Sequence, residues 1–443
     1  MSERNGFEHP VGGSFSLGFR GADTLLWILV ITVCFFILAL RNFLLEVQYP
    51  IMYTQDGRYV FPLFFERHDF SSIFKFCDGG YRTVGPYLLG YLLTFLPARW
   101  IPHGFSLASL CLSAFTYALV FRLGLWIVRD RVFAVLMAFC VAALPLGNAQ
   151  LVGTVAWQHY NLTIILCLLL LLPFPQRLWS RVLFSLGVNI LIWSHPLSIV
   201  ILPVCVWRLW SRPQQRPEHV LFMVSAVGYG VWGVHPGPQD FSSWPYLAQI
   251  FTQRVVLESL IGPKNRAYLQ FLEGASPIAG AVFLVLVLIA WRSWGSRSAR
   301  EKEALMVLSY FQVSLLGMVV LGKHLEWIFL GMMALGRYVY APKVLFVVVF
   351  FILAFPVFRD IPRFRILLVG LVLLLTAINL NSNKMYRTNV EEGKRIVQFF
   401  ERVDRESRNC AGRVDWPMVL KRGAWDPRNG PGDWSIEIFL CRA

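Results

Sequence analysis

The feature that most constrains this chain is a series of long apolar runs separated by short polar connections. Each run has roughly the length that a helix needs to cross about 30 Å of hydrocarbon, about 20 residues. Because lipid offers the backbone no hydrogen-bond partners, such runs must be helical. With 56% hydrophobic and only 15% charged residues, the chain is also too apolar for a surface that faces water. The sequence predicts an all-α polytopic membrane protein.

The apolar runs predict about eleven transmembrane helices between residues 24 and 380. An odd number of crossings puts the two ends of the chain on opposite sides, with 1–23 in the cytoplasm and the tail 381–443 outside. The predicted spans are 24–44, 104–128, 132–147, 160–174, 181–194, 196–210, 219–235, 276–291, 304–322, 341–357 and 364–380.

Arginine residues gather in every second connection, and this sets the predicted orientation. Short cytoplasmic connections of membrane proteins carry an excess of Lys and Arg. The same pattern accounts for the formal net charge of +15, so we expect no nucleic-acid partner. The connections rich in arginine are 129–131, 177–181, 208–216, 292–302 and 359–365.

The predicted outer side carries most of the chain outside the spans. It comprises a large first loop, 45–103, a second loop, 236–275, and the tail. Residues 85–101 are apolar but short, which is typical of a helix that lies in the membrane interface. The tail reads as a small α/β unit, with a helical pattern at 391–406 and a strand-like alternation at 435–440.

The first outer loop opens with the sequence Tyr-Thr-Gln-Asp-Gly-Arg-Tyr at 53–59, directly beyond the first predicted span. A carboxylate such as Asp56, held at the membrane surface beside a cation such as Arg58, is a candidate general base. The alternative is an Asp-Gly turn in a solvated loop. Glu66 and Asp69, in the sequence Glu-Arg-His-Asp, are candidate second acids or parts of a solvated turn.

A second motif, Gly-Arg-Tyr-Val-Tyr-Ala-Pro-Lys at 336–343, lies at the predicted outer entrance of a late span. The planar guanidinium of Arg337 can give a phosphodiester two hydrogen bonds and offset charge on a leaving phosphate. The alternative is that the arginine, tyrosine and lysine side chains anchor the helix end in the interface.

This layout resembles the GT-C superfamily of membrane glycosyltransferases, which includes O-antigen glucosyltransferases, aminoarabinose transferases and arabinosyltransferases. The resemblance covers the whole chain as architecture, and a few residues as motif. It implies that Asp56 is the catalytic base and that Arg337, Tyr338, Lys343 and Arg82 bind the donor phosphate. The family commonly has two adjacent acids at this site, whereas this chain has glutamine before Asp56. A lone carboxylate can accept a proton but rarely holds a divalent metal, so we expect no metal or other cofactor.

Four further residues of the outer side are weaker candidates for substrate contacts. His159 precedes the fourth span and His195 lies in a tight turn, while Lys264 and Arg266 belong to the second outer loop. Each is equally explained as a loop, cap or packing residue. In the tail, Cys410 and Cys441 are expected to form a disulfide if that side is oxidising.

The resemblance implies a glycosyltransferase of the bacterial cytoplasmic (inner) membrane that acts on the periplasmic face. It would move a sugar from a polyprenyl-phosphate donor to lipopolysaccharide, pilin or another protein, or another cell-envelope glycan. Its partners would therefore be this donor, an acceptor and membrane lipids. Two alternatives remain: an O-antigen polymerase or ligase, and a lipid-linked sugar transporter or flippase, which would carry functional charges inside the membrane.

Overall fold

The structure, a computed structural model, is mostly helical. It describes residues 21–43, 48–50, 56, 60–65, 69–77, 80–144, 154–235, 244–261, 277, 280–281, 283–285, 287–289, 291–322, 338–379, 390–407, 416–421 and 435–440. All statements about the structure below refer to these residues.

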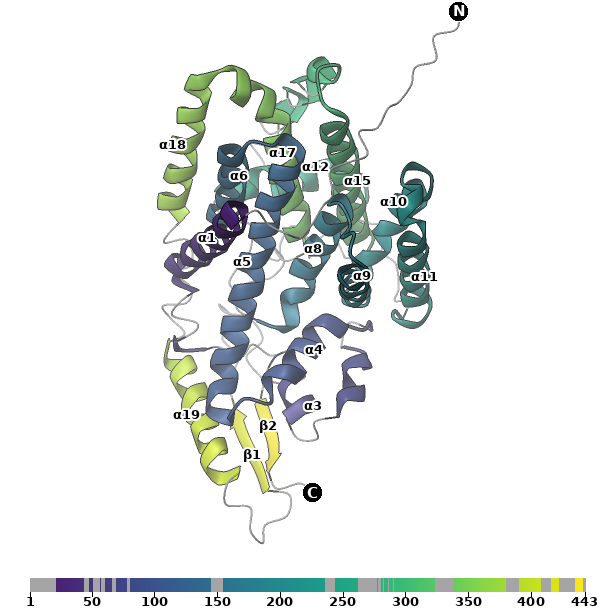
Figure 1. The fold of residues 1–443 in the computed structure, drawn as a ribbon. Helices are drawn as coiled ribbons and strands as arrows, with labels where there is room; N and C mark the ends of the chain where they lie inside the picture. Colours follow the sequence, from purple (N-terminus) through teal and green to yellow (C-terminus); the bar gives the residue numbers. More distant parts are fainter. Residues whose placement is uncertain are drawn as a thin grey trace, which may run out of the picture.

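Helices account for almost all regular structure, and a single antiparallel strand pair lies in the tail (Figure 1). Short 3-10 or π-helical segments, labelled η, extend several of the helices. The elements used below are α1 (Gly21–Leu38), η1 (Ala39–Phe43), α3 (Phe61–Phe65), η3 (Phe70–Phe74), α4 (Val84–Leu93), η4 (Ala98–Trp100), α5 (Ile101–Val128), α6 (Arg131–Ala143), η5 (Ala156–Gln158), α8 (His159–Leu171), α9 (Leu178–Ile192), η6 (Pro196–Ile201), α10 (Leu202–Ser211), η7 (Pro213–Gln215), α11 (Arg216–Trp232), η8 (Trp244–Tyr246), α12 (Leu247–Ile250), η9 (Phe251–Leu257), α13 (Glu258–Ile261), α15 (Ala299–Gly322), α17 (Tyr340–Asp360), α18 (Pro362–Asn379), α19 (Val390–Ser407), β1 (Trp416–Lys421) and β2 (Ser435–Leu440).

Within the described residues the eleven predicted spans are almost entirely helical, which confirms the helical class and is consistent with a membrane protein. Within the described residues, three helices are long and apolar enough to cross a membrane by themselves: Thr24–Arg41, Ala98–Val128 and Ala299–Leu321. The other apolar helices are shorter. The number of crossings and their orientation therefore stay predictions.

The main core surrounds α5, which has 28 residues and is about 42 Å long at 1.5 Å per residue. Helices α1, α6 and α8 pack along it, and α17 packs against α6, α8 and α15. The sharp turn between α5 and α6 is set locally. Arg129 ends α5 in the left-handed conformation at φ 56°, and the carboxylate of Asp130 accepts the Phe133 N–H at 3.0 Å to cap α6.

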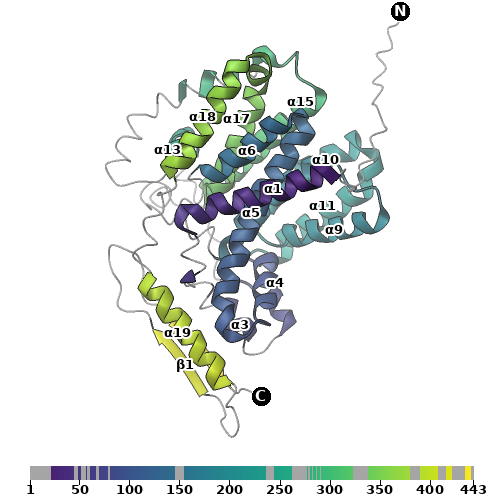
Figure 2. The same cartoon turned by 60° about the vertical axis from the view of Figure 1, so that its left-hand side comes forward.

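A second, smaller core lies at the end of the bundle where α5 begins. It joins α3, η3 and α4 of the first outer loop to α19 of the tail, and Phe61 and Phe400 meet edge to face with 4.8 Å between ring centroids. The segments at 60–93 and 390–407 are therefore packed together at one end of the molecule (Figure 2). The first part of the predicted interfacial segment 85–101 is the helix α4, which has ten residues and is too short to span a bilayer, whereas 98–101 belongs to η4 and the start of α5. A position in the membrane interface stays a prediction.

The tail contains the two elements that its sequence predicts. The helix α19 and the strand β2 match the predicted ranges to within one residue. The sequence analysis missed β1, which pairs antiparallel with β2 in a register that places Trp416 opposite Leu440. Cys410 and Cys441 lie outside the described residues.

The second predicted outer loop does not run free over the surface in its described part. Residues 244–261 are helical, and Ile250, Val255, Val256 and Leu257 belong to the main core, in contact with α17. The sequence analysis predicted no helix within 236–275 and missed these elements, while the side of the membrane on which they lie stays a prediction. The short apolar stretches of this part are interrupted by polar residues and do not have the length of a predicted span, so the hydropathy pattern could not identify them.

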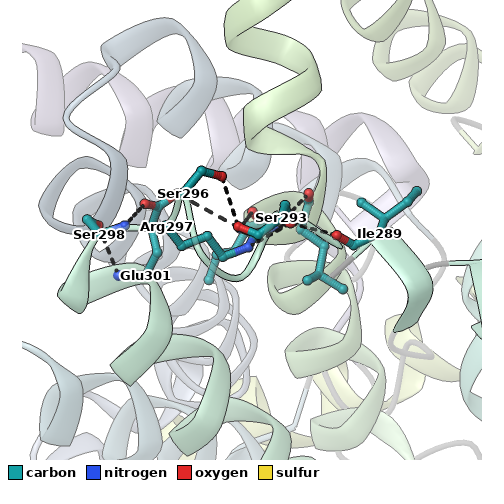
Figure 3. Close-up of polar contacts among 8 residues, drawn as sticks. Ile289, Ser293, Ser296, Arg297, Ser298 and Glu301 are labelled. Carbon is teal, nitrogen blue, oxygen red and sulfur yellow. Dashed lines mark hydrogen bonds and ion pairs between the residues drawn. The ribbon is translucent and has the colours of Figure 1, made fainter. Parts of the chain in front are cut away.

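The helix α17 contains an internal proline, Pro356, whose missing N–H leaves the carbonyl of Ile352 without its helical donor. Arg297 supplies donors in its place. Its Nη1 donates to the Ile352 carbonyl at 2.9 Å, and its Nη2 to the Leu353 carbonyl at 3.1 Å. The arginine is buried, and its Nε and Nη2 also donate to the hydroxyl of Ser293, four residues earlier in the chain (Figure 3).

The next residues begin α15 with a capping box. The Ser298 N–H donates to Glu301 Oε2 at 2.8 Å, and the Glu301 N–H donates to the Ser298 hydroxyl at 3.3 Å (Figure 3). This arrangement fixes the connection from which Arg297 reaches α17.

The arginine and the proline should therefore be energetically coupled. We expect Arg297→Ala to destabilise the protein by about 1–3 kcal/mol, because two buried carbonyls lose a charged donor. In a Pro356→Ala background the alanine N–H can bond the Ile352 carbonyl, so the same substitution should cost less. Reversible unfolding in mixed micelles would measure both differences, and equal costs in the two backgrounds would refute the coupling.

Candidate functional site

Asp56 is buried, with 1% of its surface exposed, and it does not form a solvated turn. Its Oδ2 accepts the N–H of Val155 at 2.9 Å, and its Oδ1 accepts the N–H of Ala156 at 2.7 Å. These amides stand where η5 and α8 begin, and the first N–H groups of a helix have no partner within the helix. The carboxylate from the first outer loop thus caps the helix at a distance.

Burial raises the pKa of Asp56 to about 7, because the ionised form loses its hydration. The two backbone N–H groups oppose this shift but do not cancel it. A carboxylate with a pKa near 7 is part ionised at neutral pH and is well matched to accept a proton from a hydroxyl group.

Two histidines, both distant from Asp56 in the sequence, are connected to it through Ala156 and through each other. His159 begins α8, and its Nδ1 lies 2.7 Å from the carbonyl of Ala156, whose N–H bonds Asp56. Its ring stacks on that of His195, with centroids 4.4 Å apart and planes 10° from parallel. Both predicted histidines therefore belong to one site.

The protonation of the two rings follows from their partners. An Nδ1–H of His159 donating to the Ala156 carbonyl makes its Nε2 the basic nitrogen. His195 Nδ1 accepts the Leu197 N–H at 3.3 Å, so its proton is on Nε2. Burial, and to a smaller extent His159, lowers the pKa of His195 well below its ordinary value, so that ring is uncharged at neutral pH.

Tyrosines enclose the histidine pair. Tyr81 meets both rings edge-on, with centroid distances of 6.1 Å to His159 and 5.6 Å to His195. Tyr160 lies 5.1 Å from His195 and 6.3 Å from Tyr338, the predicted phosphate ligand that precedes α17. Four segments distant in the sequence thus supply one aromatic cluster, defined as Tyr81, His159, Tyr160, His195 and Tyr338.

Backbone contacts hold the first outer loop onto this cluster. The Val84 N–H donates to the Trp193 carbonyl at 3.0 Å, and the Gly85 N–H donates to the Ser194 hydroxyl at 2.9 Å. A Cβ at Gly85 would lie 2.5 Å from that hydroxyl and 2.5 Å from Leu162, so only glycine allows this approach.

Arg82 is fixed by its backbone, while its side chain lies over an aromatic ring. Its N–H donates to the Gly233 carbonyl at 2.9 Å, and its carbonyl accepts the Tyr229 hydroxyl at 2.8 Å. The guanidinium lies 4.7 Å from the centre of the Phe76 ring. No carboxylate within the described residues pairs with it.

A buried polar network places the start of α17 against α5 and α8. The hydroxyls of Tyr117 and Tyr340 lie 3.0 Å apart, and Tyr340 donates to Asn161 Oδ1 at 2.9 Å. The Asn161 amide donates to Ser113 at 3.0 Å and to Gln158 at 2.8 Å. Such interhelical bonds replace the hydrophobic driving force that lipid does not provide.

The sequence analysis expected Lys343 to lie at the entrance of a span, but its side chain is buried. It is 1% exposed, and its ammonium lies 2.9 Å from Glu258 Oε2. Arg254 Nη1 donates to the other oxygen of Glu258 at 3.2 Å. The sequence analysis missed this buried triad, because Arg254 and Glu258 lie within 236–275, which it assigned to the second outer loop.

Asp69 is an exposed cap and lies outside the aromatic cluster. It accepts the Ser71 N–H at 2.9 Å and the Ser71 and Ser72 hydroxyls, and so begins η3. The hydrogen bonds from Ser71 lower the pKa of this carboxyl, which suits a cap and opposes the role of a second base. The other site predictions, at Arg58, Glu66, Lys264, Arg266 and Arg337, lie outside the described residues.

No group of three or more His, Cys, Asp or Glu side chains suited to a metal ion occurs in the described parts of the chain. The residues that the structure adds to the site are the amides of Val155 and Ala156, the Asn161 network and the buried triad. The spacing of Gln158 and Asn161 on one face of an apolar helix was a signal for the network. The backbone N–H groups of Val155 and Ala156 gave no such signal, because every residue except proline has one and the apolar side chains of these two residues do not indicate a polar site.

Comparison with known proteins gives no family for this chain. No family model matches it, and no curated protein matches it either.

The raised pKa of Asp56 predicts how stability depends on pH. The protonated carboxyl contributes stability that is fully present below its unfolded pKa, about 3.9, and is lost as the pH rises through about 7. Asp56→Asn removes this titration. We expect the Tm of the variant, relative to wild type, to rise between pH 4 and pH 7 and to level off above. A difference in Tm that does not change over this range would contradict the assignment.

Proposed function

We propose that the chain is a glycosyltransferase that moves a sugar from a polyprenyl-phosphate donor to a hydroxyl acceptor at the outer face of a bacterial cytoplasmic membrane. The observation that carries the proposal is the buried carboxylate of Asp56, whose pKa is raised to about 7. It lies at the end of the bundle where the predicted outer segments meet. The GT-C-like layout of the sequence supports the same conclusion.

In this proposal Asp56 takes the proton of the acceptor hydroxyl as its oxygen attacks the anomeric carbon. The bond from that carbon to the phosphate oxygen breaks, and the polyprenyl phosphate leaves with the electron pair. The uncharged His195 and the tyrosines of the aromatic cluster would line the sugar, because apolar ring faces and polar edges suit a sugar's alternating surface.

The phosphate requires a cation, and the described residues favour Arg82 over Lys343. The ammonium of Lys343 is engaged by Glu258, whereas Arg82 has no carboxylate partner among these residues. We therefore assign the donor phosphate to Arg82 together with Arg337, and we assign Lys343 to holding α17. Lipopolysaccharide, a protein or another envelope glycan would be the acceptor.

Asp56→Asn should reduce transfer about 10²- to 10⁴-fold, because the amide keeps the shape of the side chain but cannot accept a proton. The matched control is Asp69→Asn, which makes the same change at an exposed cap and should leave the rate unchanged. Purified variants with a synthetic polyprenyl-phosphate sugar would be compared at saturating donor. Near-normal turnover of Asp56→Asn, with intact folding, would remove the proposed base.

A lipid-linked sugar transporter is the second candidate, and one observation favours it. The charged triad of Arg254, Glu258 and Lys343 is buried inside the helix bundle, where ionisable residues often mark a transport pathway.

Proteoliposomes separate the two functions. A transporter should move a fluorescent polyprenyl-phosphate sugar across the bilayer without an acceptor, and Glu258→Gln should abolish this movement. The proposed enzyme should show no movement and should release polyprenyl phosphate only when an acceptor is present. Acceptor-independent translocation that depends on Glu258 would replace the glycosyltransferase with the transporter.

A further inference from the structure

Two arginines share one carboxylate at the end of the bundle opposite Asp56. Arg208 Nη2 lies 2.7 Å from Glu303 Oε1, and Arg212 Nη2 lies 2.6 Å from the same oxygen. Arg208 lies in the last turn of α10, Arg212 follows the end of this helix, and Glu303 lies in the first turns of α15. One negative charge therefore serves two guanidinium groups, which leaves an excess positive charge.

Arg208 is the unusual member of this group. Its side chain is fully buried, yet its Nε and Nη1 have no hydrogen-bond partner. His219, on the neighbouring helix α11, is also buried with both ring nitrogens unpartnered, and it lies close enough to interact electrostatically with Arg208 and Arg212. Buried guanidinium nitrogens without hydrogen-bond partners are costly, because these donors lose water and gain nothing.

More positive charge surrounds the pair. Arg300 interacts electrostatically with Arg129, Arg212 and Glu303, and its guanidinium lies 5.6 Å from the centre of the Trp126 ring. Positive charge from α5, α10 and α15 therefore converges here, beside the N-terminal end of α15, where the helix dipole also favours an anion.

The cluster of Arg208, Arg212 and Glu303 is partly exposed at the protein surface, unlike the buried triad that contains Lys343. The side chains of Arg212 and Glu303 are 21% and 19% exposed, whereas those of Arg254, Glu258 and Lys343 are at most 3% exposed. Trp207 and Trp210 on α10 are exposed beside it, as expected for a helix end in a membrane interface.

We propose that Arg208 and Arg212, with Arg300 and Arg129 nearby, form a phosphate-binding site at this end of the bundle. A phosphate group offers several acceptor oxygens and the negative charge that the group lacks, and arginine forks bind it in two-point geometry. The interface position favours the phosphate of an anionic phospholipid head group as its source. Arg212, which is part exposed, moves to admit the ligand, and Glu303 holds the arginines in place until then.

The proposal predicts opposite effects of two substitutions. Arg212→Gln removes a phosphate donor and should weaken binding about tenfold, which corresponds to about 1.4 kcal/mol. Glu303→Gln removes the competing negative charge but keeps an acceptor for both arginines, so it should strengthen binding by a similar factor. A purely structural ion pair predicts that neither substitution changes lipid binding.

Delipidated protein in neutral detergent would be titrated with phosphatidylglycerol, and the apparent Kd read from the rise in Tm. The matched control, Arg292→Gln, removes an exposed arginine of the predicted cytoplasmic connection outside this group and should leave the Kd unchanged. Phosphatidylcholine should stabilise less. A parallel titration with inorganic phosphate identifies the source, because a comparable stabilisation would assign the site to a soluble phosphate.

The result that overturns the proposal is a Kd for both probes that is the same in wild type, Arg212→Gln and Glu303→Gln. Equal weakening by Arg212→Gln and Arg292→Gln would also overturn it, since binding would then follow net charge and not this site. Both test residues are part exposed, so we expect the variants to fold. Size-exclusion chromatography before the titration would verify this.

Discussion

The two hydrogen bonds from Val155 and Ala156 to Asp56 are the contact on which the rest of the site depends. They tie the segment after α1 to the start of η5 and α8, where the main core and the second, smaller core meet. Without this acceptor, two buried N–H groups would lose their partner, at a cost of about 1–3 kcal/mol each. Asp56 is thus both the candidate base and the residue that joins the first loop to the bundle, so loss of activity alone cannot distinguish the two roles. The pH dependence of stability can, because only a titrating group produces it.

Polar contacts inside the bundle fix the positions of its helices, which apolar packing alone does poorly in lipid. A helix surrounded by hydrocarbon gains little by exchanging lipid for another apolar helix, so specific contacts must fix its register. The helix α17 has three such contacts along its length: Tyr340 in the Asn161 network, Lys343 on Glu258, and the carbonyl of Ile352 on Arg297. Each involves a different partner element. Together they fix the position of the residue that precedes α17, Tyr338, within the aromatic cluster.

The sequence predicted what depends on local pattern and failed where the outcome depends on distant contacts. Hydropathy located the helices, but the apolar run at 85–101, predicted as one helix, is divided between α4, η4 and the start of α5. The alternation at 435–440 predicted β2, but its partner β1, which contains Pro417, has no clear alternation and was missed. Asp56 and His159 could be named from the sequence but not joined, since their connection runs through the backbone atoms of Ala156. Lys343 was assigned to an entrance because its partner, Glu258, lies 85 positions earlier in what looked like a loop.

The electrostatics of the aromatic cluster explain why Asp56 can be a base at all. A carboxylate beside a fixed cation is ionised far below neutral pH and holds its charge too well to accept a proton. Burial keeps the imidazole of His195 uncharged, and within the described residues Asp56 accepts hydrogen bonds from neutral amides. Burial therefore dominates, and the pKa of Asp56 stays near 7. In the proposed glycosyltransferase, the donor phosphate would be bound by Arg82, whose guanidinium lies over Phe76, and not by a cation bonded to Asp56. A single displacement at the anomeric carbon would require the proton acceptor and the leaving phosphate to lie on different sides of the sugar, so the proposal assigns these two roles to different residues.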